Sequence, residues 1–451
     1  MGYRQWRLGA GPGCIAVALA VTVWASMIGL DDARGETPAA PVPDPLTLTD
    51  ALAYAKHPHP QADNVRLQFE IARLQLDSVR AANNPRIVLD AIPRMAERTN
   101  NPASGLEDDS FLQLRLSVPI YDFGRTKSRR AAAIETVAAQ ELRWLDTVQY
   151  RKLAILEGYL NVLLADMRYA IDNEVMTLAF LRFDRLRERR DLFDQVSEID
   201  VIEAESVYRD AFARRTRSQL DRQRFRLLLA AALGTPSDIP GELAPADISV
   251  WTERAIPDFE TSVQYALQSN PRLLAAQKRL AAADAATATA AAAYRPTLNA
   301  EVELSEYQRS TGSRDDVRAS LNLSIPLYQG SNHRVARSIA QAEANQIRAE
   351  LQQLQFDVRD ELFGLLQELQ VATVERTAAA TRETYRDLYM DRSRTLYEME
   401  MRADLGDAQA KLLEASWLSR RADFKLAVTW AQLDALLGRP VIPESIMESE
   451  P

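Results

Sequence analysis

One stretch occurs twice in this chain and constrains its fold more than any other feature. Ser-Val-Pro-Ile-Tyr at residues 117–121 is followed by Gly124, and Ser-Ile-Pro-Leu-Tyr at residues 324–328 is followed by Gly330. Each copy ends an alternating apolar run and opens a helical pattern that has no proline until the end of its half of the chain. A short strand that leads directly into a very long helix, twice, predicts a tandem repeat.

The scarce glycines support this duplication. The chain has only 16 glycines among 451 residues, and 47% of its residues are hydrophobic, a composition typical of long helices. Three glycine pairs stand at the same or nearly the same separation: Gly124 and Gly330, Gly158 and Gly364, Gly234 and Gly438. Random placement seldom aligns three pairs of so rare a residue.

The N-terminus has the order of a secretory signal peptide. Two arginines precede an apolar run at residues 14–30, and two aspartates follow it. The alternative is a single membrane anchor, because a run of this length lies at the lower limit for spanning. The signal interpretation assigns residues 1–35 to the signal and 36–46 to a proline-rich leader. The single cysteine, Cys14, leaves with the signal, so we expect an exported chain without disulfides.

Prolines, glycines and hydrophobic periodicity divide the rest of the chain into elements. The first repeat is expected at 47–235, an inter-repeat linker at 236–257, the second repeat at 258–440 and a C-terminal tail at 441–451. The first repeat has strands at about 86–98 and 109–121, and long helices at 125–193 and 200–233. The second has strands at about 297–308 and 316–328, and long helices at 331–399 and 403–437. A coiled-coil-like seam is expected on the first long helix: Leu142, Leu145, Val148, Ile155, Tyr159 and Val162.

The expected strands alternate apolar and polar residues, so each has one apolar and one polar face. The candidates for a lipid-facing surface are Leu112, Leu114, Leu116, Val118, Leu321, Leu323 and Ile325. Beyond the N-terminal run no segment is apolar enough for a transmembrane helix. Four strands cannot close a barrel, and an open sheet edge in lipid leaves backbone groups unpaired. Three copies of the chain would supply about twelve strands, an even number within the known range of barrels.

Several classes of function lack support in the sequence. The net charge is −9 and no basic face appears, which argues against nucleic acid. The sequence has no phosphate loop and no nucleophile motif, so we expect no enzyme, no catalytic residues and no cofactor. His57 and His59 alternate with prolines and favour a turn at a helix start over a metal site.

Acidic residues cluster near the strand ends, and two interpretations of them stay open. They are Glu97, Glu107, Asp108, Asp109, Glu301, Glu303, Glu306, Asp315 and Asp316. Carboxylates that line a pore favour cations. Acidic residues in loops, in contrast, are commonly just solvated.

The paired junctions, the His57-Pro58 and Asn270-Pro271 breaks and the two Leu-Gly-x-Pro helix ends resemble the TolC-like outer-membrane efflux proteins over about residues 46–440. This resemblance implies a mainly α, tandem-repeat fold: two long antiparallel helical hairpins and four strands per chain. It further implies a homotrimer, with a 12-stranded β-barrel in the outer-membrane lipid of a Gram-negative bacterium and an α-helical barrel in the periplasm. The partners implied are a periplasmic adaptor (membrane fusion) protein and, through it or directly, an inner-membrane pump.

The resemblance also implies a periplasmic gate at the turns between the long helices. Tyr397 and Arg402 match an aromatic residue followed five positions later by arginine, and Asp200 is an acidic partner on the first hairpin. Asp404 and Asp407 are acidic candidates nearby; the alternative for all five is a solvated surface. The chain departs from the family here, since both turns lack the usual glycine.

The expected function is a passive duct of a tripartite efflux or type I secretion system. The alternative is a soluble periplasmic coiled-coil scaffold or adaptor protein, whose small sheet would need no apolar outward face. Cargo is not encoded in any feature that we recognise.

Overall fold

The structure is a computed structural model that describes residues 42–97, 106–308, 315–328, 330–399 and 405–441. The expected signal peptide, most of the leader and nearly all of the C-terminal tail lie outside these residues. So do the gate candidates Arg402 and Asp404.

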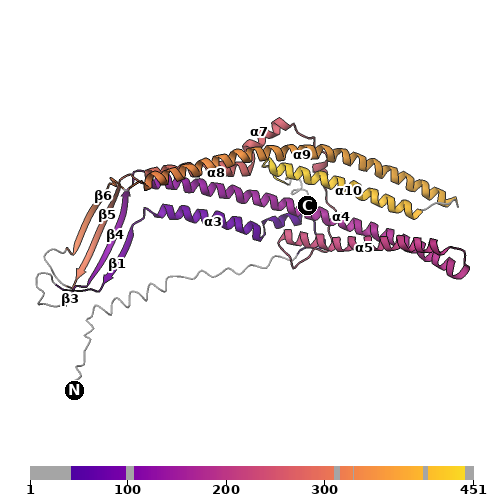
Figure 1. The fold of residues 1–451 in the computed structure, drawn as a ribbon, viewed down its shortest axis with the longest axis horizontal. Helices are drawn as coiled ribbons and strands as arrows, with labels where there is room; N and C mark the ends of the chain where they lie inside the picture. Colours follow the sequence, from indigo (N-terminus) through magenta and orange to yellow (C-terminus); the bar gives the residue numbers. More distant parts are fainter. Residues whose placement is uncertain (1–41, 98–105, 309–314, 329, 400–404, 442–451) are drawn as a thin grey trace, which may run out of the picture. The chain divides into compact units, whose positions relative to one another are not determined.

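Four long helices dominate the fold (Figure 1). α4 is Arg125–Phe193 and α5 is Glu198–Leu233. α9 is Asn332–Glu398 and α10 is Leu405–Leu436. With 69 residues α4 is ~100 Å long at ~1.5 Å per residue. Each long helix packs against the helix that returns from it, so the chain forms two antiparallel helical hairpins.

The local signals at the ends of these helices explain their bounds. α4 begins after Gly124 and α5 ends at Gly234, and both glycines have the left-handed conformation that a residue without Cβ adopts readily. The residue after α4, Asp194, is also left-handed. The next helix, α5, is capped by Ser197, whose side chain accepts a hydrogen bond from the Asp200 backbone N–H at 3.3 Å.

Two shorter helices precede the strands of each half. α3 is Pro60–Ala81 and packs on α4; α8 is Pro271–Ala292 and packs on both α4 and α9. Each has proline in its first turn and a side-chain cap before it. His59 Nδ1 accepts from the Gln61 N–H, so this histidine caps a helix, as the alternation with proline predicts.

Small helices complete both halves. They are α2 (Leu48–Ala53), the 3₁₀ helix η1 (Tyr54–Lys56), α6 (Ser249–Thr252) and α7 (Phe259–Ser269).

The four main strands form one antiparallel sheet in the order β1-β4-β5-β6 (Figure 1). Their bounds are Arg86–Ile92 for β1, Phe111–Tyr121 for β4, Thr297–Tyr307 for β5 and Val317–Ser324 for β6. A separate pair, β2 (Met95–Glu97) and β3 (Leu106–Asp108), extends the first hairpin beyond the sheet. The first expected strand is therefore two strands, interrupted at Pro93, which has no N–H to donate.

The register sorts apolar and polar side chains to opposite faces of the sheet. One row across all four strands is Leu89, Leu114, Leu304 and Val317. The neighbouring row, on the other face, is Val88, Arg115, Glu303 and Arg318. Because the side-chain period of a strand is two, this pairing places Leu112, Leu114, Leu116, Val118, Leu321 and Leu323 on one face.

The second junction differs from the expectation. β6 ends at Ser324, so Ile325, expected on a strand, follows the sheet rather than lying in it. The next residue, Pro326, has no N–H for a ladder. In the first copy β4 continues to Tyr121, but its pairing with β5 shifts between Pro119 and Tyr121. The two copies of one motif thus pair differently.

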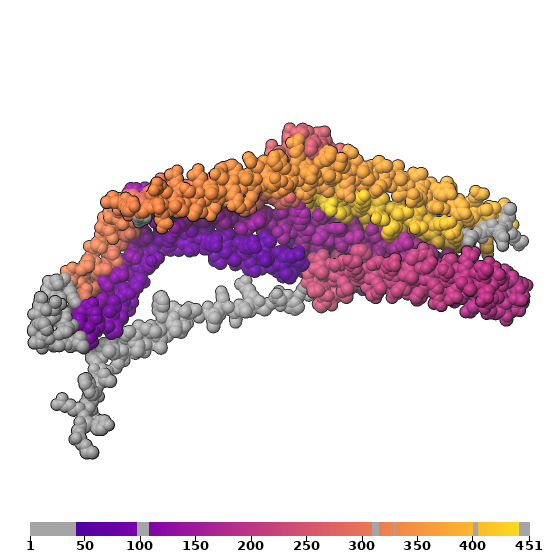
Figure 2. All heavy atoms as spheres, viewed as in Figure 1, coloured from indigo at the N-terminus to yellow at the C-terminus, as the bar shows by residue number. Residues whose placement is uncertain are grey.

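The hydrophobic core lies where the four long helices meet α2, α6, α7 and α8. Its fully buried side chains include Ile155, Leu156, Tyr159, Leu229, Leu233, Trp251, Leu273, Leu362, Leu369 and Leu433. The Tyr159 hydroxyl donates to a backbone carbonyl, with Leu46 O at 2.8 Å and Ala244 O at 2.6 Å, and joins the start of the described chain to the inter-repeat segment. In Figure 2 the yellow atoms of α10 lie between the orange α9 and the magenta α4, both of which it contacts.

Only part of the expected seam on α4 is core. Ile155, Tyr159 and Val162 are fully buried, but Leu145 is exposed. The interpretation was wrong for Leu145, because periodicity identifies a helix face but not the length over which a partner covers it. The fold class itself is confirmed: two long antiparallel helical hairpins with a small four-stranded sheet.

Candidate functional site

Two features of the sheet are unfavourable in water unless another surface covers them. Within the described residues β1 pairs only with β4, and β6 only with β5, so both outer strands present an open edge. The apolar face is also exposed: Leu89, Leu114, Leu304, Val317 and Leu321 all reach solvent, Leu321 with 67% of its surface. An open edge with an exposed apolar face is a poor arrangement in water, and natural proteins cover such edges or close them.

The polar face of the same sheet carries charged side chains that contact one another. Arg115 on β4 lies 3.8 Å from Asp90 on β1, 3.0 Å from Glu301 and 3.2 Å from Glu303, both on β5. Arg318 on β6 lies 3.6 Å from Glu303. We call these five residues the charged ladder. The sequence identified Glu301 and Glu303 but not their partners, since the pairing depends on the register of separate strands.

Glu301 and Glu303 therefore lie on β5, within the sheet, rather than in a loop. Asp109 also differs from a solvated loop residue, because it is buried and forms an ion pair with Arg94. Asp108, in contrast, is exposed. It accepts hydrogen bonds from the backbone N–H and the hydroxyl of Ser110, two residues further along the chain.

The turn between α4 and α5 exposes apolar side chains next to the gate candidate Asp200. Leu192, Phe193 and Ile199 are all exposed, Ile199 with 77% of its surface. The Asp200 carboxylate accepts from the Ser197 hydroxyl at 2.7 Å, so Asp200 takes part in the cap of its own helix. A capping role and a gate role are compatible, because an ionised carboxylate has two oxygens and can accept several hydrogen bonds.

The described gate candidates of the second hairpin, Tyr397 and Asp407, lie at the end of α9 and the start of α10. Tyr397 is 62% exposed at the end of α9. Asp407 forms an ion pair with Lys411 one turn along α10, and the hydrogen bond and charge of Asp407 hold the pKa of Lys411 above its ordinary value. The structure describes no contact between Asp200 and Tyr397, so within one chain these candidates are separate.

A cluster of titratable groups between α4, α8 and α9 was not predicted. The Arg272 guanidinium lies 3.3 Å from the Tyr150 hydroxyl and 3.1 Å from the Glu361 carboxylate. Burial raises the pKa of nearby Asp146 to about 6, although the charge of Arg272 opposes this. No local pattern could reveal the cluster, because its members are far apart in the sequence.

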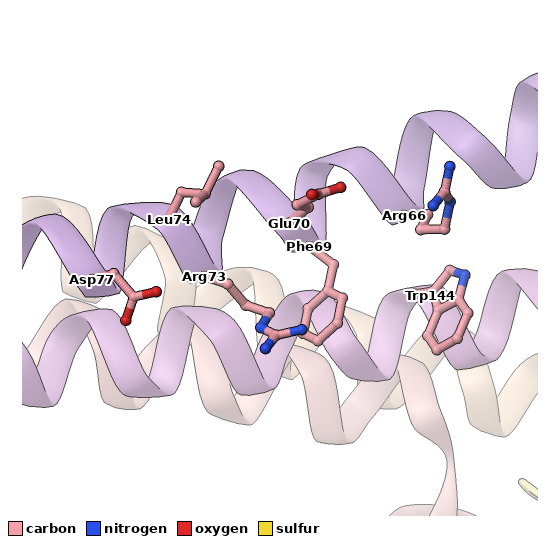
Figure 3. Close-up of a pocket in the computed structure, with 7 residues that line it drawn as sticks. All are labelled: Arg66, Phe69, Glu70, Arg73, Leu74, Asp77 and Trp144. Atoms are coloured by element: carbon pink, nitrogen blue, oxygen red, sulfur yellow. The ribbon is translucent and has the colours of Figure 1, made fainter. Parts of the chain in front are cut away.

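Figure 3 shows a shallow groove between α3 and α4. The Phe69 and Trp144 rings stack there with centroids 6.2 Å apart, and the Arg73 guanidinium lies 5.7 Å from the Phe69 ring centroid. Aromatic and cation–π contacts of this kind hold helices together, so we assign the groove a packing role.

Two further properties concern chemistry and membranes. Among the described residues, no group of three or more His, Cys, Asp or Glu side chains could hold a metal ion. No helix in the described ranges combines the length and the hydropathy needed to cross a membrane.

Comparison with known proteins identifies the family. The model of the outer membrane efflux protein family matches residues 54–174 and 262–439, and this chain belongs to that family. Protein CyaE of Bordetella pertussis is 28% identical over 330 residues, which cover 69% of this chain and 66% of that protein. The chain thus matches slightly less than two thirds of the length of this relative.

Solved structures show the same fold. A membrane protein from Pseudomonas aeruginosa superposes with a TM-score of 0.71 at 21% identity, over 87% of this chain and 92% of that chain. The CmeC outer membrane channel of Campylobacter jejuni gives 0.72 at 14% identity, over 87% and 85%. The fold is the TolC-like fold, and the family and fold are those of channel proteins rather than enzymes.

Proposed function

We propose that three copies of this chain form a passive duct through the outer membrane and periplasm, as part of a tripartite efflux or type I secretion system. One observation carries the proposal: a four-stranded sheet has an exposed apolar face, a charged opposite face and two open edges. Closing that sheet with copies of itself pairs every edge, turns the apolar face to lipid and encloses the charged face.

The repeat organisation supports the same proposal. Residues 47–235 and 258–440 are proposed as two structural repeats, joined by the linker at 236–257. Each contributes one strand hairpin and one helical hairpin, so three chains would give about twelve strands and a matching ring of helices. The remaining segments, a signal at 1–35 and the leader at 36–46, fit export to the outer membrane.

The expected result is a trimer in the outer membrane. Protein extracted by detergent from isolated outer membranes should have the mass of three chains, measured by light scattering with correction for detergent. A soluble monomer in the periplasmic fraction would contradict the channel and favour the alternative, a soluble scaffold or adaptor protein.

The partners of the duct are proposed from family membership. A periplasmic adaptor protein would contact the ends of the helical hairpins, and an inner-membrane pump would supply the free energy. The exposed Leu192, Phe193 and Ile199 support contact with another protein at the α4–α5 turn, because apolar groups in such a position gain from burial. The duct itself is proposed to be neither an enzyme nor a binder of nucleic acid.

We further propose that the hairpin ends form a gate. Tyr397, Arg402, Asp200, Asp404 and Asp407 would restrict the periplasmic end by polar contacts between neighbouring hairpins. The exposure of Tyr397 and of Asp200 supports this role.

The variant Arg402→Ala should raise single-channel conductance in planar lipid bilayers, since it removes one polar contact that narrows the end of the tube. Arg394→Ala is a matched control, because Arg394 is an exposed arginine further from the same end of α9. Equal conductance of the two variants and the native channel would exclude a gate role for Arg402.

A further inference from the structure

The charged ladder crosses every strand of the sheet. Asp90 lies on β1, Arg115 on β4, Glu301 and Glu303 on β5, and Arg318 on β6. Arg115 is the central member, since its guanidinium is within 4 Å of three carboxylates from both neighbouring strands. The ladder itself holds three carboxylates and two guanidinium groups, an excess of one negative charge, while Arg86 on the same face of β1 lies outside the ladder.

The position of the ladder is determined by the alternation of the strands. Arg115 stands between Leu114 and Leu116, and Glu303 between Val302 and Leu304. The apolar neighbours belong to the exposed opposite face, which the proposed barrel turns to lipid. The ladder therefore faces the interior of that barrel, and the inference rests on the proposed function.

The energetics of the ladder point away from a purely structural role. The side chains of Arg115, Asp90 and Glu301 are 38%, 35% and 32% exposed, and ion pairs exposed to this extent contribute little to stability; Glu303, at 15%, is less exposed. In a pore, however, fixed charges within about a Debye length, ~8 Å at physiological salt, act on each passing ion. Carboxylates in a pore wall favour cations, and a guanidinium among them opposes this preference.

We infer that Arg115 determines the charge selectivity of the duct, by neutralising carboxylates of the barrel wall that otherwise favour cations. In the native channel Arg115 offsets Asp90, Glu301 and Glu303. Without it, Arg318 on β6 is the remaining cation of the ladder, and it reaches only Glu303. Removal of Arg115 leaves the carboxylates nearest β1 and β4 without a counter-charge.

The test is the reversal potential of channels in planar bilayers under a potassium chloride gradient. This potential reports the ratio of cation to anion permeability and does not depend on the size of the conductance. Arg115→Gln should raise the ratio by about twofold or more, with the effect weakening at high salt. Glu303→Gln, which keeps Arg115, should lower the ratio.

Two controls separate the ladder from net charge and from folding. Arg86→Gln also removes one positive charge from the polar face of the sheet, on β1. Among the described residues, however, Arg86 forms no ion pair. It should shift the ratio less than Arg115→Gln. The double variant Arg115→Gln with Glu303→Gln restores the charge balance and should return the ratio towards the native value.

The failures of the two proposals are distinguishable. Native protein that forms no channel overturns the duct itself. Channels whose permeability ratio is the same in the native protein, Arg115→Gln and Glu303→Gln overturn the role of Arg115 and leave the duct intact. Equal shifts for Arg86→Gln and Arg115→Gln also overturn it, because net charge alone then explains selectivity.

Discussion

Replacement of Gly438 by alanine is expected to lower the free energy of unfolding by about 3 kcal/mol. Gly438 follows α10 with a φ of +71°, a conformation that costs an L-residue about 1 kcal/mol. A Cβ there would also collide with the backbone carbonyl of Ser269, whose carbon lies 3.0 Å from the Cβ position. Backbone must then move, and overpacking of this kind costs about 1–3 kcal/mol.

The close approach at Gly438 has a structural cause. The Ser269 hydroxyl donates to Leu437 O and the Asn270 side chain donates to Leu436 O, each at 2.7 Å. The turn between α7 and α8 thus satisfies the last carbonyls of α10, and it must lie against the backbone to do so. Asn270 also caps α8, so one turn joins the ends of three helices.

Gly330 offers a matched control for this prediction. It has a φ of +72°, but no atom lies within 4 Å of its Cβ position. Gly330→Ala should therefore cost only the conformational term, about 1 kcal/mol. Thermal unfolding in detergent, followed by circular dichroism, should rank native above Gly330→Ala above Gly438→Ala. Equal losses for the two variants would show that the Ser269 contact contributes nothing.

Replacement of Arg151 by methionine is expected to destabilise the protein by about 4 kcal/mol. Arg151 is only 7% exposed, and its guanidinium donates to three carbonyls: Ala55 O at 3.1 Å, His57 O, and Leu233 O at 3.0 Å. These carbonyls end η1 and α5. Methionine fills the same space but leaves them unpaired in the interior, at about 1–3 kcal/mol for each group.

The prediction for Arg151 includes an order of variants. Arg151→Lys should lose less than Arg151→Met, because an ammonium group reaches some of the carbonyls but lacks the planar fork. Arg187→Met is a control on the same helix, where an exposed arginine pairs with Asp184, and it should lose less than about 1 kcal/mol. A loss for Arg151→Met as small as that for Arg187→Met would contradict the capping role.

Arg151 also shows where the two halves differ. The position that corresponds to it in the second half, by the spacing of Gly124 and Gly330, is Asp357. There Asn270, which caps α8, satisfies the end of the return helix, whereas in the first half His59, which caps α3, stands at that place and the distant Arg151 supplies the donors. The duplicated architecture is thus maintained by different side chains in its two halves.

The sequence by itself determined the elements and much of their order. Left-handed glycines and prolines mark helix ends through backbone sterics, which act within a few residues. Alternation marks strands because side chains of neighbouring residues point to opposite faces. From these local signals the long helices, the four main strands and the two-faced sheet could all be predicted, and they led to the proposal that further copies close the sheet.

Only the tertiary structure decided which distant residues meet. Arg151 appeared to be an ordinary helix residue until folding placed it against η1 and α5, and Leu145 appeared to be core. The partners of Arg115 depend on the register between strands nearly half the chain apart. Such contacts follow from the packing of whole elements, whose free energy is shared among many side chains, so no short pattern records them.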